Sequence, residues 1–243
     1  MRWVVLALMC LATPGLATTS LAATCENTTY HGNRYTVCTV DVAHDDLRLF
    51  HADETGRVMG SFRAVEDSLD GKRLVFAMNA GMYHPDRAPV GYYVENGVQK
   101  MRVVTNPGPG NFGLLPNGVL CISDKAAQVV ETLRFTAEQP PCRDATQSGP
   151  MLVIDGALHP RFLPDSTSRN LRNGVGTTAD GRKAFFVISN NPVTFHTFGS
   201  FFRDHLKVPN ALYLDGTVSR LHAPALGRSD FGFQMGPIVG VVE

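Results

Sequence analysis

The chain has 243 residues, and its 22 Lys and Arg side chains are balanced by 22 Asp and Glu side chains. A formal net charge of zero means that the chain has no excess of positive charge to attract a nucleic acid or an anionic membrane, so we predict no nucleic-acid partner. The length and composition are typical of one large globular domain and exclude a collagen-like or disordered chain.

The N-terminal residues predict an export signal. Residue 2 is Arg, an apolar stretch covers 3–12, and small residues fill 17–23. Ser20-Leu21-Ala22 fits the small-x-small rule for cleavage, which gives a signal peptide over 1–22 and a mature domain over 23–243. A transmembrane anchor is the rival interpretation, but it needs an apolar run of about 18 residues. We therefore expect a periplasmic or secreted protein with no membrane span after signal removal.

Four cysteines remain after the signal, and their even number in an exported chain favours two disulfides. The spacings suit a hairpin or a short loop, so we predict bonds between Cys25 and Cys38 and between Cys121 and Cys142. A zinc site is the alternative, although the chain has no C-x-x-C pair and no neighbouring histidine spacing to support it.

Apolar runs separated by turn residues predict the following elements in chain order: strands over 34–42 and 47–50, a helix over 62–69, strands over 74–78, 90–94, 98–104 and 119–122, a helical or extended segment over 126–133, strands over 151–154, 174–178 and 184–189, a helix after residue 192, and strands over 211–214 and 238–242. Strand hairpins with few helices indicate an α+β fold. We expect a single domain rich in antiparallel β-sheet, with a few helices packed on the sheets.

The two clearer helices carry start and stop signals. Ser61 is placed to cap the first and Gly71 to end it, while Thr194 is placed to cap the second. Each helix has one apolar face, formed by Phe62, Val65 and Leu69 in the first and by Phe195, Phe198, Phe202 and Leu206 in the second. We expect the second helix to pack on a sheet.

Asp215 raises the question of function, because it lies in an Asp-Gly pair that also reads as a hairpin turn. Such pairs occur as well at 96–97, 117–118, 155–156 and 180–181, each beside apolar runs. Taken alone, each pair is more often structural than catalytic.

Several known catalytic patterns are absent from the sequence, namely G-x-S-x-G, the P-loop, H-E-x-x-H and the EF-hand loop. The nearest approaches to metal-ligand spacing are His84 with Asp86 and the group Asp41, His44, Asp45 and Asp46. Charged turn residues between strands are usually solvated, so we predict no metal ion and no cofactor.

Five motifs occur in an order that resembles one family: N-A-G-M-Y at 79–83, Q-S-G-P at 147–150, R-N-G-V-G at 172–176, N-A-L-Y-L-D-G at 210–216 and I-V-G at 238–240. The ordered set is similar to the phosphodiester glycosidases, which include the animal mannose 6-phosphate uncovering enzyme and bacterial exported proteins described as exopolysaccharide-related. The resemblance spans nearly the whole mature chain. It implies hydrolysis of a sugar joined through its anomeric carbon to a phosphodiester, with a free sugar and a phosphomonoester as products.

The resemblance also implies roles for five residues. Ordinary glycosidases need two carboxyl groups, one of them an acid for the leaving alkoxide, whereas phosphate leaves without that help. Asp215 is then the catalytic carboxylate, as nucleophile or base, and Arg172 the catalytic cation that grips the phosphate. Asn79, Gln147 and Ser219 are expected to bind or orient the substrate. Asp155 is the alternative carboxylate, although its Asp-Gly pair favours a turn.

One position departs from the family pattern. The family has L-D-G-G-x-S, whereas this chain has Thr217 in place of the second glycine. A Cβ at a position with positive φ is strained, so Thr217 predicts altered or lost activity if the backbone is left-handed there.

Two other functions stay open at this point. One is a non-catalytic carbohydrate-binding or polysaccharide-binding module, and the other is a metal-dependent phosphodiesterase that cleaves the P–O bond.

Overall fold

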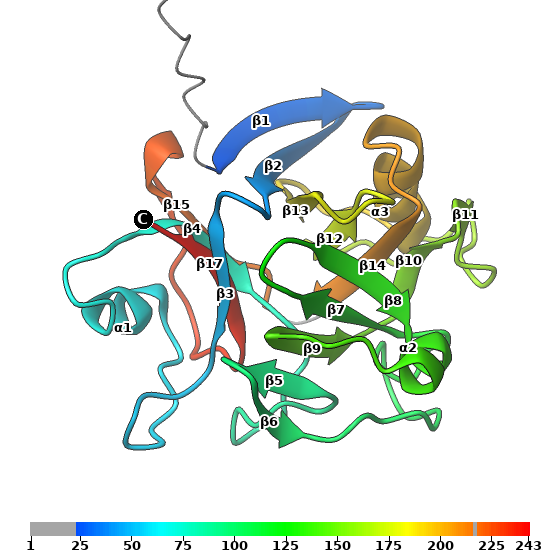
Figure 1. The fold of residues 1–243 in the computed structure, drawn as a ribbon. Coiled ribbons are helices and arrows are strands. Elements are labelled where there is room, and N and C mark those ends of the chain that lie inside the picture. The colour runs from blue at the N-terminus through cyan, green and yellow to red at the C-terminus, as the bar shows by residue number, and fades with distance from the viewer. Residues whose placement is uncertain (1–22, 216–217) are drawn as a thin grey trace, which may run out of the picture.

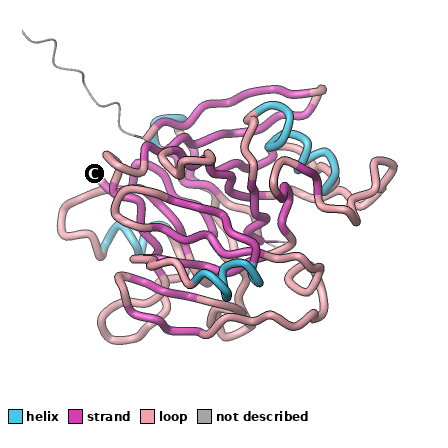
Figure 2. Tube along the Cα trace, turned by 45° about the vertical axis from the view of Figure 1, so that its right-hand side comes forward, coloured by secondary structure: helices cyan, strands magenta, loops and turns pink. Residues whose placement is uncertain are grey.

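The computed structural model describes residues 23–215 and 218–243, so the predicted signal peptide over 1–22 and Thr217 lie outside the described residues. Three antiparallel sheets with few helices make up the described chain, as the apolar pattern predicts. Figure 1 shows α1 on the left and α2 and α3 on the right of these sheets, and Figure 2 shows how little of the chain is helical.

The largest sheet has seven strands in the order β1-β2-β13-β12-β14-β10-β11. Their bounds are β1 (Thr24–Tyr30), β2 (Asn33–Asp41), β13 (Lys183–Ser189), β12 (Asn173–Thr177), β14 (Asn210–Asp215), β10 (Met151–Ile154) and β11 (Ala157–Leu158). Neighbouring strands are antiparallel, so the end of β14 lies beside the start of β12, and the start of β12 lies beside the end of β13.

The second sheet has the order β16-β15-β4-β17-β3 and the third β6-β5-β9-β7-β8. The second comprises β16 (Arg228–Ser229), β15 (Leu221–Ala223), β4 (Leu74–Asn79), β17 (Ile238–Val242) and β3 (Asp46–Phe50). The third comprises β6 (Val98–Met101), β5 (Tyr93–Glu95), β9 (Asp144–Ser148), β7 (Gly118–Ile122) and β8 (Ala127–Glu131).

One buried core joins the three sheets. It includes Phe186 and Leu214 of the first sheet, Phe76 and Val239 of the second, and Leu120 of the third, each essentially inaccessible to solvent. Burial of these side chains supplies most of the favourable folding free energy, at about 25 cal/mol per Å² of apolar surface.

The helices are short, and two of them, the first and the third, begin at the predicted caps. They are α1 (Phe62–Asp67), α2 (Thr132–Glu138), α3 (Phe195–Ser200), the π-helical turn η1 (Phe201–His205) and the 3₁₀ turn η2 (Pro224–Leu226). The side chains of Ser61 and Thr194 accept hydrogen bonds from the third residue that follows each of them, which confirms both N-caps. The first helix ends at Asp67 rather than near Gly71, and no helix among the described residues is long and apolar enough to cross a membrane.

Helix α3 and η1 cover the outer face of the seven-stranded sheet, as predicted. The rings of Phe198, Phe201 and Phe202 pack there against Tyr35 and Val187. Part of this contact depends on Gly176 of β12, because a Cβ at that position would lie 2.8 Å from the Phe202 ring.

Both predicted disulfides are confirmed. Cys25 bonds Cys38 between the paired strands β1 and β2, and Cys121 bonds Cys142 between β7 and the loop before β9. The segment over 126–133, which the sequence left open between helix and strand, is mostly the strand β8.

The Asp-Gly and Asn-Gly pairs do not all form hairpin turns. Asn96-Gly97 and Asp155-Gly156 both have positive φ at each residue and turn between paired strands. Asn117 and Gly118 instead enter the buried strand β7, so the hairpin signal at that pair is wrong.

Candidate active site

The candidate site begins where the ends of three strands meet. Asp215 ends β14 and lies opposite Asn173, the first residue of β12, at a register shift in the ladder. Asn79 ends β4 in the neighbouring sheet and reaches across to Asn173. Three polar residues, each at a strand end and each less than a tenth exposed, are therefore placed at one junction between sheets.

Paired amide groups fix this junction. Asn79 Nδ2 donates to Asn173 Oδ1 over 3.1 Å, and Asn173 Nδ2 donates to the Asn79 carbonyl over 2.9 Å. Ser219 Oγ lies 3.2 Å from Asn173 Oδ1 and 3.2 Å from the Leu171 carbonyl, and both oxygens are placed to accept its hydrogen bond. The structure thus brings Asn79, Ser219 and Asp215 together, with Asn173 as the residue that connects them.

Asp215 is 7% exposed and its charge acts on two tyrosines. Burial raises the pKa of the Tyr83 phenol, and the Asp215 carboxylate raises that pKa further, while Arg87 and Arg220 oppose the rise. Burial also raises the pKa of Tyr213, which lies two residues before Asp215, and the carboxylate again adds to the effect. Both phenols therefore stay protonated at neutral pH and can donate hydrogen bonds at the site.

Close packing of the third sheet explains why the segment after Asn79 is Ala-Gly. A Cβ on Gly81 would lie 2.2 Å from Thr146 Oγ1 and 2.7 Å from the Gln147 carbonyl oxygen. Ser148 anchors the same strand to the site, since its hydroxyl donates to the Leu214 carbonyl over 2.7 Å. The backbone just before Asp215 is thereby held by a side chain from another sheet.

Arg172 lies behind Tyr213 rather than at an open surface. Arg172 is 1% exposed, and its guanidinium stacks on the Phe195 ring at 3.6 Å from the ring centroid. Nε donates to the Val193 carbonyl over 2.9 Å, Nη2 to the Ser168 carbonyl over 3.3 Å, and Nη1 contacts the Tyr213 hydroxyl at 3.5 Å. Burial lowers the pKa of Arg172, yet that pKa starts so high that the group stays charged. This geometry differs from the predicted phosphate grip, which needs two adjacent N–H groups facing the ligand.

Gln147 is the second predicted residue whose position differs from the expectation. Its side chain points into the third sheet, where Oε1 accepts from the backbone N–H groups of Tyr92 and Val104, each over 3.0 Å. Nε2 donates to the Val104 carbonyl over 2.7 Å and contacts Thr132 Oγ1 at 3.2 Å. The residue is 1% exposed, and its amide stabilises the strands and loop that support the site.

Arg220 is a cation at the site that the sequence did not single out. Its backbone N–H donates to Asn79 Oδ1 over 2.9 Å, and its guanidinium donates to the Phe233 carbonyl. Nε is buried and has no hydrogen-bond partner within 23–215 and 218–243. Burial lowers the pKa of this group, while Tyr83 and Asp230 raise it.

A cavity of about 280 Å³ opens beside Arg220. Ser219 and Asn170 line it together with Phe231 and Phe233, whose side chains are 93% and 82% exposed. Large exposed aromatic residues beside a polar cavity are typical of a binding surface.

The other candidate carboxylates serve in turns. Asp155 is held by Arg134, whose Nη1 and Nη2 donate over 3.1 and 2.7 Å, and this pairing lowers the Asp155 pKa. Asp45 accepts from the backbone N–H groups of Ala23 and Asp41 and so orders the turn between β2 and β3. Across the described part of the chain, no group of three or more His, Cys, Asp or Glu side chains is arranged to hold a metal ion.

Comparison with known proteins gives the family. The sequence model described as phosphodiester glycosidase matches residues 72–222, which include Asn79, Asn173, Asp215 and Arg220. The chain is 33% identical over 185 residues to the uncharacterized protein YigE of Escherichia coli (strain K12), across 76% of this chain and 72% of YigE. The chain belongs to the phosphodiester glycosidase family.

Solved structures share the fold of this chain at low sequence identity. The catalytic domain of zebrafish N-acetylglucosamine-1-phosphodiester alpha-N-acetylglucosaminidase, auto-inhibited by its pro-peptide, aligns with a TM-score of 0.59 and 12% identity, over 91% of this chain and 82% of that one. A putative exported protein from Burkholderia pseudomallei aligns with a TM-score of 0.57 and 12% identity, over 86% and 74% of the two chains.

Three residues at the site were not predicted from the sequence: Tyr83, Asn173 and Arg220. Tyr83 and Asn173 lie inside the N-A-G-M-Y and R-N-G-V-G motifs, so each belongs to a motif from which the sequence selected another residue. Arg220 had a weaker signal, as the residue directly after Ser219. Strand register, which the sequence does not give, selects Asn173 over Arg172 as the neighbour of Asp215.

Proposed function

We propose that this protein hydrolyses a glycosyl phosphodiester at the anomeric carbon and releases a free sugar and a phosphomonoester. The observation that supports this most directly is the junction of Asp215, Asn173, Asn79 and Ser219, which draws on three of the family's motifs. A single buried carboxylate beside neutral hydrogen-bonding groups suits a reaction whose leaving group needs no acid.

In the proposed reaction, the bond between the anomeric carbon and the phosphate oxygen breaks, and both bonding electrons leave with the phosphate. Asp215 stabilises the positive charge that develops on the sugar ring, either by attacking the anomeric carbon or by accepting a proton from the incoming water. The oxygen of water ends on the sugar, and one of its protons is released as the phosphomonoester forms.

We assign the phosphate contact to Arg220 rather than to Arg172. Arg220 borders a cavity, has a buried Nε without a partner in the described chain, and lies next to Ser219. The outer N–H groups of Arg172 are directed at carbonyls and at Tyr213, so its charge acts on the site through Tyr213. Asn79 and Asn173 position the Ser219 hydroxyl and the Arg220 backbone, and Tyr83 is placed to donate a hydrogen bond.

The zebrafish protein's name gives the first substrate to test, the methyl phosphodiester of N-acetylglucosamine 1-phosphate. We expect sugar release by the purified protein, and Asp215→Asn should lower kcat by about 10²- to 10⁴-fold because the group that stabilises the transition state is lost. Asp155→Asn is the matched control, since it removes an exposed turn carboxylate and should keep the wild-type rate. In the same assay, Arg220→Ala should raise KM. Arg172→Ala should mainly lower the free energy of unfolding, which is measured by denaturant unfolding.

Hydrolysis in ¹⁸O-labelled water separates this function from its rivals. Label in the released sugar supports C–O cleavage, whereas label in the phosphate indicates a phosphodiesterase and refutes the proposal. Binding without turnover indicates a carbohydrate-binding module. Unchanged kcat in Asp215→Asn removes the carboxylate from the mechanism.

A further inference from the structure

A second and larger cavity lies against the paired strands β1 and β2 of the seven-stranded sheet. Its volume is about 670 Å³, and its lining comes from β1, β2, the end of β13 and the segment around β16. The lining residues are Asn27, Thr28, Thr29, Arg34, Tyr35, Asn190, Leu226 and Arg228. Amides, hydroxyls and guanidiniums dominate this set, which is the chemistry that recognises sugar hydroxyls and anionic groups.

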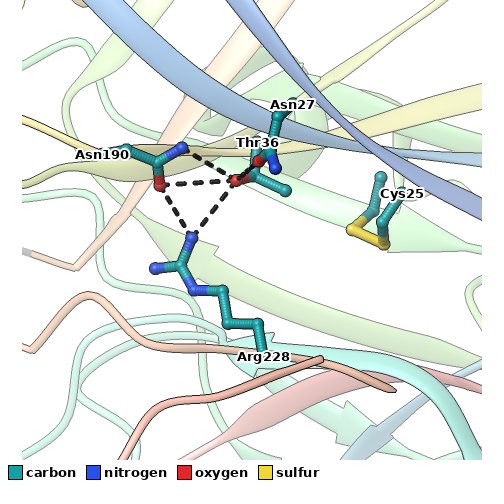
Figure 3. Close-up of a disulfide and its surroundings, with 6 residues drawn as sticks. Cys25, Asn27, Thr36, Asn190 and Arg228 are labelled. Carbon is teal, nitrogen blue, oxygen red and sulfur yellow. Dashed lines mark hydrogen bonds between the residues drawn. A yellow bond between two sulfur atoms is a disulfide. The ribbon is translucent and has the colours of Figure 1, made fainter. Parts of the chain in front are cut away.

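A hydrogen-bond network holds one wall of this cavity in place (Figure 3). Thr36 Oγ1 donates to Asn27 Oδ1 over 2.7 Å and accepts from Asn190 Nδ2 over 2.9 Å. Arg228 Nη1 donates to Asn190 Oδ1 over 2.7 Å, while Nη2 of the same side chain pairs with Asp230 at 2.7 Å. Three strands from two sheets, β1, β2 and β16, are thereby joined to the residue that follows β13, so the polar groups are positioned before any ligand arrives.

The disulfide strengthens the same wall. Cys25 and Cys38 are register partners, and two residues along each strand the next pair on the same side is Asn27 and Thr36. Figure 3 shows the disulfide beside this pair. A covalent link at this point limits separation of β1, an edge strand, from β2.

Arg34 supplies a cation that is not already paired. Its backbone is anchored on both sides, since its N–H donates to Asn191 Oδ1 over 2.7 Å and its carbonyl accepts from the Asn190 N–H over 2.8 Å. Its guanidinium, by contrast, is exposed and makes no hydrogen bond or ion pair within the described ranges. Neither cavity lining, as far as the structure describes the chain, contains an Asp or Glu. The charged side chains that line the two cavities are therefore all cationic, which favours binding of an anion.

The large cavity is connected to the candidate active site by strand register. Asp215 lies opposite Asn173, Asn173 opposite Ile188, and Ile188 opposite Thr36. Three strand spacings of about 4.8 Å place Thr36 roughly 14 Å from Asp215 along the sheet. A single sugar phosphodiester does not span that distance, whereas a short oligomer does.

The smaller cavity at Arg220 is connected to the larger one by two chain segments. The segment 228–233 contributes Arg228 to the large cavity and Phe231 to the small one. A second connection runs from Asn190 in the large cavity to Val193, which pairs with Asn170 in the small one.

We propose that the large cavity is a distal subsite for an anionic glycan in which sugar units are joined by phosphodiesters. The terminal linkage enters at Asp215, and a phosphate further along the chain is held by Arg34 while sugar hydroxyls contact Asn27 and Asn190. The proposal deepens the proposed function and rests on it for the identity of the cleaved bond. It assigns a polymer, rather than a small phosphodiester, as the preferred substrate class.

The test compares Arg34→Glu with Arg63→Glu, a charge reversal at an exposed arginine of α1. The probes are the methyl phosphodiester of N-acetylglucosamine 1-phosphate and a synthetic oligomer of about six N-acetylglucosaminyl phosphate repeats, a length chosen to exceed the roughly 14 Å between the two places. We expect Arg34→Glu to raise KM for the oligomer at least tenfold and to leave kcat/KM for the monomer within twofold of the wild type. Arg63→Glu should change neither. An oligomer KM that is unaffected by Arg34→Glu overturns the proposal and leaves the proposed function standing.

A binding measurement keeps the two proposals separable. Calorimetry with Asp215→Asn should show the oligomer binding at least tenfold more tightly than the uncharged N-acetylglucosamine hexasaccharide, and adding Arg34→Glu to this variant should remove that preference. This result supports the subsite even if neither phosphodiester is hydrolysed, in which case the proposed function alone fails. Equal affinity for the charged and uncharged oligomers, or no binding of either, overturns the subsite.

Discussion

The paired amides of Asn79 and Asn173 give the sharpest prediction about how the site is held. Asn173→Ala removes the one acceptor that Asn79 Nδ2 has among the described residues, and it also removes the donor to the Asn79 carbonyl. An orphaned buried donor costs about 1–3 kcal/mol and a lost hydrogen bond about 1 kcal/mol, so we expect the free energy of unfolding to fall by about 2–4 kcal/mol. Asn79→Ala orphans the Arg220 N–H instead and should cost about 2–3 kcal/mol.

The double variant distinguishes this network from two independent contacts. With Asn79 truncated, its Nδ2 no longer exists, so truncating Asn173 as well adds no further orphaned donor to the Arg220 N–H that Asn79→Ala already leaves unpaired. We therefore expect the double variant to lose about 1–2 kcal/mol less than the sum of the single losses. Urea unfolding at equilibrium measures all four free energies, provided that the slope with denaturant stays constant.

A control cycle pairs Asn173→Ala with Asn27→Ala. These positions lie three strand spacings apart, roughly 14 Å, so their effects should add within about 0.5 kcal/mol. Additive losses in the Asn79 and Asn173 cycle itself would refute the reasoning, because the two amides would then not depend on each other.

Two further predictions concern stability. Replacing Cys121 and Cys142 together by Ala opens a loop with a sequence separation of 21, which should lower the free energy of unfolding by about 3 kcal/mol. Thermal or denaturant unfolding measures the loss, and an unchanged midpoint would contradict this prediction. Burial lowers the pKa of His159 below its ordinary value of 6.5, so between these two pKa values the unfolded chain binds more protons at this residue than the folded chain does. The contribution of His159 to the free energy of unfolding is therefore complete above about pH 6.5 and should fall as the pH drops toward the folded-state pKa. His159→Gln should make the slope of stability between pH 6.5 and 5 shallower, by at most about 1.4 kcal/mol per pH unit, whereas an identical slope in variant and wild type would exclude this group.

Hydrophobic pattern predicted the strands whose side chains are apolar, including the exact bounds of β10 and β17. It did not predict β1, whose sequence TCENTTY is polar and mostly exposed, because pairing with β2 and a disulfide define that edge strand. It also missed β9, where every residue of DATQS is buried. The polar groups of β9 are satisfied by partners such as Arg143 and Thr132, and such partners come from tertiary structure.

The candidate site was also predicted from the sequence only in part. Motifs selected Asp215, Asn79 and Ser219, and the structure brings these three to one junction through Asn173. The directions of Arg172 and Gln147 could not be predicted, since alternation along a strand decides which face a side chain takes, and a register shift occurs beside Asn173. Thr217, where the sequence departs from the family pattern, lies outside the described residues.

The position of β17 also determines when the candidate site can be completed during synthesis. Ile238 pairs with Phe50 on one side and with Asn79 on the other, so a strand made late in synthesis occupies an inner position of its sheet. Contacts between such distant parts of a chain form slowly, because the intervening loop must close first. A nascent chain that has not yet released residues 238–242 leaves Asn79 without its neighbouring strand, so the junction at Asn173 can be completed only after translation has passed that point.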